Sequence, residues 1–198
     1  MARDGETRHS VGVLQRFVDM VRYWGSSEQE RLDKLPCDDL FPRPDLILFR
    51  AVDVEAPAPA VFRWLCQLRV APYSYDWIDN YGRRSPQHLT PGLEDLEVGQ
   101  QFMTIFRLSG LVPGSSLTLT TDNLVLGRVA ITYRVTPTDS DRTRLLAKLV
   151  VSLPPGIRRK LMKSMLPAGD LLMMRRQLLN LKQLAERGAG TWGNPTYP

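Results

Sequence analysis

The apolar positions near the start of the chain recur every three or four residues, as on one face of an amphipathic helix. Ser10 suits the N-cap of such a helix, and Gly25 suits its end. A short helical turn is expected over residues 26–31, and the prolines and acids of residues 36–44 predict an extended strap. Within residues 10–24 the apolar face consists of Val11, Leu14, Val18 and Val21, with Phe17 and Trp24 beside it.

The pattern then changes from helical spacing to alternation. Residues 46–54 alternate well enough to predict a strand, and Pro57 and Pro59 suit the first turn of a helix after it. A second short helix is expected over residues 75–80, followed by a loop over residues 81–99. Three or four strands follow over residues 101–108, 116–121, 128–136 and 143–153, and the turn TDSDR between the last two predicts an antiparallel hairpin.

Helical periodicity returns near the end of the chain. Residues 156–187 predict a long helix that is broken near Pro167 and Gly169. Beyond the break, one face carries Leu171, Met174, Leu178, Leu181 and Ala185. We therefore expect a helical extension and strap (1–45), a main domain (46–188) and a Gly- and Pro-rich tail (189–198).

Length and composition indicate one ordinary globular domain, with 198 residues of which 43% are hydrophobic. The net charge is +5, but the basic residues are scattered and carry no aromatic-plus-basic signature, so no nucleic-acid partner is expected. Cys37 and Cys66 lie far apart, which predicts two reduced thiols, a cytoplasmic location and no metal site. Neither a secretory signal nor a membrane-spanning helix is expected.

Five segments carry a family resemblance: WGSSEQERLDKLPCDDL from Trp24, DVEAPAPAVFRWLCQL from Asp53, YSYDWIDN from Tyr73, LEDLEVGQ from Leu93 and TRLLAKLVVSLPPG from Thr143. Each is similar to a segment of a bacterial group within the START-like superfamily (SRPBCC). This superfamily includes polyketide cyclases and dehydratases, lipid-transfer proteins and birch-pollen allergens.

The resemblance implies an α+β helix-grip fold. In such a fold a curved antiparallel sheet wraps around a long C-terminal helix, two short helices follow the first strand, and a cavity lies between sheet and helix. One departure is that Cys66, Leu68 and Arg69 stand where a Gly-rich link is expected before the aromatic block. Members of the superfamily bind many unrelated molecules, so the resemblance bears on the fold more than on the ligand.

The aromatic block offers the first candidate site residues. Tyr73 and Tyr75 are candidates to hydrogen-bond a ligand carbonyl, and Trp77 to contact its apolar part. Tyr75 or a buried Asp76 is a candidate for moving a proton in an enzyme. The alternative is structural: Asp76 caps the short helix while Tyr75 and Trp77 pack it onto the sheet, and for Asp76 and Trp77 we prefer this interpretation.

The predicted last strands and the last helix offer further candidates. Tyr133 alternates with Ile131 and is expected to point inward and contact a ligand. Met174, Leu178 and Leu181 either line an adaptable cavity or form plain core.

The isolated charges of the chain are expected to be exposed. Arg50 and Lys148 lie within predicted strands, and we expect both on the solvent side of the sheet. His88 stands alone in a loop and is expected to be a surface residue. The basic run near residues 158–163 is expected to be a solvated face, with transient contact to a membrane surface as the alternative.

Together these features predict a protein that binds or carries a small hydrophobic ligand, such as a lipid, polyketide-like or isoprenoid molecule, with no cofactor. Two alternatives stay open. One is a cyclase or dehydratase acting on a polyketide-like substrate. The other is a protein-interaction module related to chaperone activators, which predicts a filled core and an exposed apolar patch. The oligomeric state is not predictable from these patterns.

Overall fold

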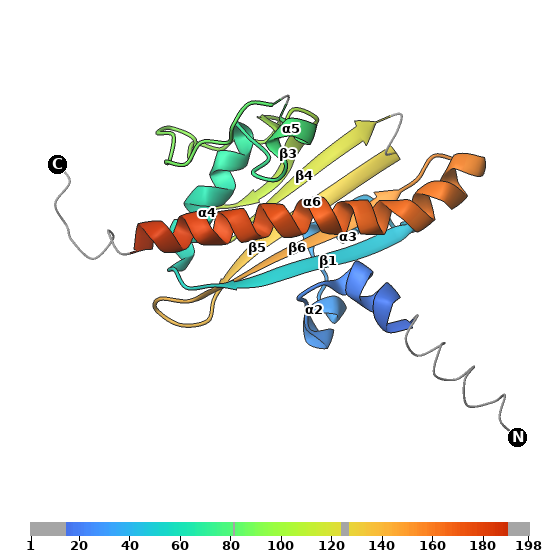
Figure 1. The fold of residues 1–198 in the computed structure, drawn as a ribbon, viewed down its shortest axis with the longest axis horizontal. Helices are drawn as coiled ribbons and strands as arrows, with labels where there is room; N and C mark the ends of the chain where they lie inside the picture. The colour runs from blue at the N-terminus through green and yellow to red at the C-terminus, as the bar shows by residue number, and fades with distance from the viewer. Residues whose placement is uncertain (1–14, 81, 124–126, 190–198) are drawn as a thin grey trace, which may run out of the picture.

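The computed structural model describes residues 15–80, 82–123 and 127–189, and its centre is one six-stranded sheet (Figure 1). Neighbouring strands are antiparallel, in the order β1-β6-β5-β4-β3-β2. The hairpin predicted between the last two strands is therefore confirmed. The strands are β1 (Leu46–Val54), β2 (Gln101–Phe102), β3 (Phe106–Val112), β4 (Ser116–Asn123), β5 (Gly127–Pro137) and β6 (Thr143–Ser152).

One face of this sheet is crossed by the long helix α6 (Ile157–Ala189), as Figure 1 shows. Between β1 and β2 the chain forms α4 (Ala58–Cys66), a 3-10 turn (Gln67–Arg69) and α5 (Asp76–Asp79). This arrangement of an antiparallel sheet, two helices after its first strand and a long C-terminal helix is the α+β helix-grip fold, so the predicted fold class is confirmed. No helix within the described residues is long and apolar enough to cross a membrane.

The two faces of the sheet are both buried over β1, β5 and β6. Alternate residues such as Leu48, Ile131 and Leu149 point toward α6 and belong to the main core. The opposite face carries a smaller apolar cluster, which is covered by the segment containing α2 (Glu28–Leu32) and α3 (Pro36–Leu40). That cluster consists of Leu35, Cys37, Phe41, Phe49, Ala51, Ala130, Leu146 and Val150.

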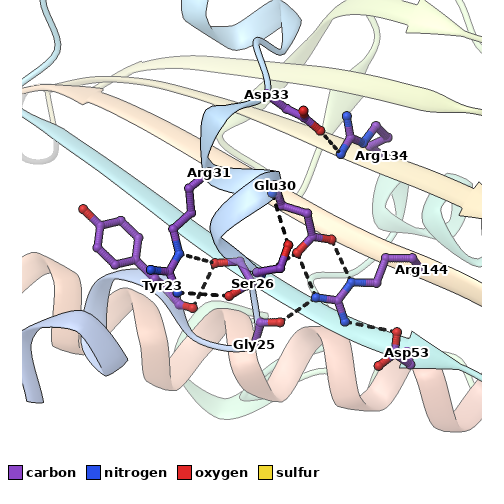
Figure 2. A network of polar contacts seen from close by, with 10 residues as sticks. Tyr23, Gly25, Ser26, Glu30, Arg31, Asp33, Asp53, Arg134 and Arg144 are labelled. Atoms are coloured by element: carbon purple, nitrogen blue, oxygen red, sulfur yellow. Dashed lines mark hydrogen bonds and ion pairs between the residues drawn. The ribbon is translucent and has the colours of Figure 1, made fainter. Parts of the chain in front are cut away.

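Ion pairs and hydrogen bonds connect the segment that contains α2 and α3, here called the covering segment, to the sheet. Arg144 on β6 donates to both carboxylate oxygens of Glu30, at 2.8 and 2.9 Å, and to Asp53 at 3.1 Å (Figure 2). Lys148 Nζ lies 2.6 Å from Asp38 Oδ2, and the Lys148 residue as a whole is only 4% exposed. The expectation that Lys148 faces solvent is therefore wrong, because the covering segment supplies a carboxylate above it.

The segment expected to be an extended strap contains the helix α3. Pro36 occupies its first turn, where the missing N–H costs no helical hydrogen bond. Asp38 Oδ2 also accepts from the backbone N–H of Leu35 at 2.8 Å, which satisfies the start of the helix. Prolines and acids therefore mark a helix start here, and not an extended chain.

Two other predicted elements differ from the structure. Residues 101–108 form two strands, because Met103 and Thr104 adopt positive φ angles of 42° and 66° and turn the chain. The last helix continues through Pro167 without a break. Leu166 before the proline and Met174 after it pack on the same core, and this shared packing offsets one lost helical hydrogen bond.

The amphipathic helix near the N-terminus is described over residues 15–23, while its predicted start lies outside the described residues. Gly25 follows it with φ of 75°, and a Cβ there would lie 2.1 Å from the carbonyl oxygen of Ala51. The Trp24 carbonyl accepts from the Ala51 N–H at 3.1 Å, and the Trp24 ring packs against the main core. The end of this helix therefore packs against the domain, as expected.

Candidate ligand cavity

A cavity of about 530 Å³ lies between the inner face of the sheet and α6. Its size is within the range of small-molecule sites. Strands β5 and β6 contribute Val129, Ile131, Leu149 and Val151, the turn between β2 and β3 contributes Met103 and Ile105, the start of β3 contributes Phe106, and α6 contributes Leu166, Met173 and Met174. Pro72 and Ile78 complete the apolar part of the wall.

Tyr133 and Gln177 form a fixed polar pair on this wall. The Tyr133 hydroxyl donates to Gln177 Oε1 at 2.6 Å, and Gln177 Nε2 donates to the backbone carbonyl of Pro72 at 2.7 Å. Tyr133 is fully buried, and burial strongly raises the pKa of its hydroxyl. The phenol is therefore neutral at any physiological pH.

Asp170 brings a carboxyl group to the same wall, facing Arg50. Arg50 Nη2 lies 2.7 Å from Asp170 Oδ2, and the Arg50 side chain is fully buried. Burial raises the pKa of Asp170 to about 6, although the Arg50 guanidinium pulls it in the opposite direction. Burial likewise lowers the pKa of Arg50, which Asp170 partly offsets.

The position of Arg50 corrects the expectation that it faces solvent. On β1 it alternates with Leu48 and Val52, so its side chain points toward α6. There Arg50 donates to the carbonyl oxygens of Phe49 at 2.7 Å and Arg22 at 2.9 Å. Backbone carbonyls and one carboxylate thus replace the water around both terminal nitrogens of the guanidinium, while Arg50 Nε is buried without a partner among the described residues.

Of the predicted ligand-binding residues, Tyr133 and Met174 line the cavity. Leu178 and Leu181 are buried in the main core but lie outside the cavity wall. Tyr73 is also buried outside the wall, with its ring edge-on to Trp64 at 6.1 Å between centroids. Tyr133 and Met174 therefore lie where a ligand in the cavity could contact them. That they contact a ligand stays a prediction.

Tyr75, Asp76 and Trp77 of the aromatic block lie outside the cavity wall. Asp76 accepts from the backbone N–H and the hydroxyl of Ser85, at 2.8 and 2.5 Å, which anchors the following loop to α5. Tyr75 is half-buried outside the wall, and Trp77 is 76% exposed, so Trp77 packs neither on the cavity nor on the sheet. The neighbouring Ile78 lines the cavity in their place.

Sequence reasoning missed Asp170 and Gln177, although a signal for them was present. They stand seven residues apart, two turns of one helix, on the face that also carries Leu166, Met173 and Met174. Polar residues inside such an apolar face indicate a polar partner or a site. His88 is absent from the cavity wall, and no group of His, Cys, Asp and Glu that could hold a metal ion occurs among the described residues.

No protein-family model and no curated protein matches the sequence. The structure resembles solved proteins, among them a protein of Mesorhizobium loti with 17% identity and a TM-score of 0.44 over 70% of this chain and 97% of the other. The Zhui aromatase/cyclase of a Streptomyces species has 16% identity and a TM-score of 0.44 over 75% and 96% of the two chains. CalU16 of Micromonospora echinospora has 12% identity and a TM-score of 0.45 over 77% and 91%. Likenesses of this size identify neither a ligand nor an activity.

Proposed function

We propose that this protein binds and carries a small, mostly apolar molecule between the sheet and α6. The observation that supports this is the cavity of about 530 Å³, which apolar side chains dominate. Cores are normally packed to near-crystalline density, so leaving such a space open lowers stability. Each 100 Å² of apolar ligand surface removed from water contributes about 2.5 kcal/mol. Lipid, polyketide-like and isoprenoid molecules all have the apolar bulk for this.

We infer that the ligand enters between α5, the β2–β3 turn and the middle of α6. Ile78 and Ile105 line the cavity and are also 51% and 44% exposed, so they form its rim. Gly169 also lines the cavity from α6, and apart from its chain neighbours and the surrounding helix backbone no described atom lies within 4 Å of the position that its Cβ would take. A larger side chain at residue 169 is therefore expected to narrow the mouth without a clash.

This makes Gly169→Leu the sharpest test of the cavity, with Ala168→Leu as its matched control. Ala168 is the exposed neighbour of Gly169 and is not part of the wall. The assay is the fluorescence of the neutral apolar probe N-phenyl-1-naphthylamine, together with native mass spectrometry of the purified protein. We expect Gly169→Leu to weaken probe binding at least about tenfold and Ala168→Leu to leave it unchanged. A native protein that binds no probe and carries no passenger contradicts the proposal.

A second candidate function is proton transfer on a polyketide-like substrate. It is favoured by one observation, the Asp170 carboxyl, whose pKa of about 6 suits a general acid or base inside an apolar cavity. Asp170 replaces Asp76 and Tyr75 in this hypothesis, since neither of those lines the cavity. If the passenger extracted from the protein loses water on incubation, and Asp170→Asn stops the loss, the enzyme is supported. The interaction-module alternative predicts a filled core, which the cavity does not favour.

A further inference from the structure

The hydrogen-bonding directions in the cavity restrict the polar group that a ligand can carry, provided that the ligand-binding function proposed above holds. The Pro72 carbonyl accepts from Gln177 Nε2, which fixes the side-chain amide with Oε1 toward Tyr133. The amide oxygen can only accept, so the Tyr133 hydroxyl must give its proton to Gln177. What Tyr133 offers to the cavity is therefore an oxygen lone pair.

Asp170 offers the same chemistry. Its Oδ2 faces Arg50 at 2.7 Å, and none of the hydrogen bonds among the described residues goes to its Oδ1. An ionised carboxylate only accepts hydrogen bonds. The negative charge of Asp170 also raises the pKa of the Tyr133 hydroxyl, after the larger effect of burial, which indicates that the two groups lie near each other. Asp170 and Tyr133 both line the cavity and thus present two acceptors on its largely apolar wall.

An anionic ligand finds no cationic partner among the described residues of this wall. No Lys, Arg or His belongs to the described residues that line the cavity. The nearest cation, Arg50, lies behind Asp170, and its guanidinium is engaged by that carboxylate and by the carbonyls of Phe49 and Arg22. A ligand carboxylate would face the Asp170 charge directly. A ligand ammonium group would be attracted by Asp170, but the Arg50 charge behind that carboxylate offsets the attraction, and the ammonium would lose its hydration in an apolar wall.

We propose that the cavity selects an apolar molecule with a neutral hydroxyl group, an alcohol or a phenol, whose O–H donates to one of these acceptors, Asp170 first because it is charged. The corresponding methyl ether lacks the proton and leaves both acceptors without a partner. The corresponding carboxylic acid is rejected by its charge at neutral pH. The cavity therefore discriminates by hydrogen-bond direction as well as by size.

Three probes of similar size test this: 2-naphthol, 2-methoxynaphthalene and 2-naphthoate, with affinities measured by calorimetry or ligand-observed NMR at pH 7.5. A hydrogen bond to a charged acceptor predicts that 2-naphthol binds at least about tenfold more tightly than the ether. We expect 2-naphthoate to bind most weakly. Equal affinity for naphthol and ether, or tighter binding of the naphthoate, overturns the inference while leaving the carrier function in place. If none of the three probes and no N-phenyl-1-naphthylamine binds, the proposed function itself has failed, and this inference with it.

Asp170→Asn identifies the group responsible. Without the Asp170 charge, Arg50 is no longer neutralised, so naphthoate should gain affinity while the preference for naphthol over its ether shrinks. Asp122→Asn removes an exposed carboxylate on β4 and is the control for net charge. Tyr133→Phe is a second variant that keeps the ring in the core and should also reduce the preference for naphthol. Unchanged selectivity in both cavity variants contradicts the assignment.

Discussion

The pH dependence of stability provides a direct measure of how strongly the protein buries Asp170. Its pKa of about 6, against 3.8 for the free side chain, means that the folded state binds a proton more tightly than the unfolded state does. Between these two pKa values only the folded protein holds the proton, so the free energy of unfolding falls as pH rises. At about 1.4 kcal/mol per tenfold change in proton affinity, the total loss is about 3 kcal/mol. It is complete above pH 6.

Other carboxyl groups titrate in the same range, so the measurement is a comparison with Asp170→Asn. Urea unfolding of both proteins is followed from pH 3.5 to pH 7.5. The difference in unfolding free energy, native protein minus variant, should fall by about 3 kcal/mol as pH rises and then stay level. Asp122→Asn, which removes an exposed carboxylate, should show no such change relative to the native protein.

Two results would refute this reasoning. Parallel pH profiles for the native protein and Asp170→Asn would mean that the carboxyl group is hydrated in the folded state. A difference that rises with pH would mean that the attraction of Arg50, which lies 2.7 Å away, exceeds the cost of burial. The carboxyl signal of Asp170, followed by NMR titration, decides between these two explanations because it gives the pKa of the folded protein directly.

Three further predictions concern packing. Gly25→Ala should lower the free energy of unfolding by at least about 2 kcal/mol, since its φ is 75° and the added Cβ would lie 2.1 Å from the Ala51 carbonyl oxygen. A change below about 0.5 kcal/mol in urea unfolding contradicts the close approach. Leu178→Ala should cost about 2–5 kcal/mol in the same assay, because Leu178 is fully buried in the main core, and a smaller loss would indicate that the core collapses around the deletion. Arg144→Met removes the contacts to Glu30 and Asp53 and so loosens the covering segment. The thiol of Cys37, which α3 of that segment packs against the sheet, should then react with Ellman's reagent several-fold faster while Cys66 does not; equal acceleration at both thiols would indicate global unfolding instead.

The fold was predictable because its signals are local. Alternation located β1 at Leu46–Val54 as the structure has it, and the turn between β5 and β6 was readable from TDSDR. Pro167 was misleading, since a proline weakens a helix locally while the packing of both its sides on one core is a long-range effect. Met103 and Thr104, which turn the chain between β2 and β3, carry no turn signal of the Gly or Asn kind.

The site was less predictable, because its polar groups come from distant parts of the chain. Arg50 and Asp170 are 120 positions apart, and each alone reads as a surface charge. The composition of the aromatic block predicted ligand-binding residues, but Asp76 anchors a loop and Trp77 is exposed to solvent. Tyr133 was found by strand alternation, since periodicity reports the face of a side chain even where its partners are unknown.

The buried ion pair between Arg50 and Asp170 has two possible roles, one structural and one in ligand binding, and an experiment can distinguish them. Arg50 contacts carbonyls of the first helix, β1 and α6, through Arg22, Phe49 and Pro167, so a purely structural role accounts for the guanidinium. In that case Asp170 is only a counter-charge. The purely structural role does not account for the position of Asp170 on the cavity wall, because replacing a buried ion pair by apolar side chains of similar volume often makes a protein more stable. A counter-charge alone predicts that Asp170→Asn changes stability and leaves ligand selectivity intact. A receptor for a hydroxyl group predicts that both change together.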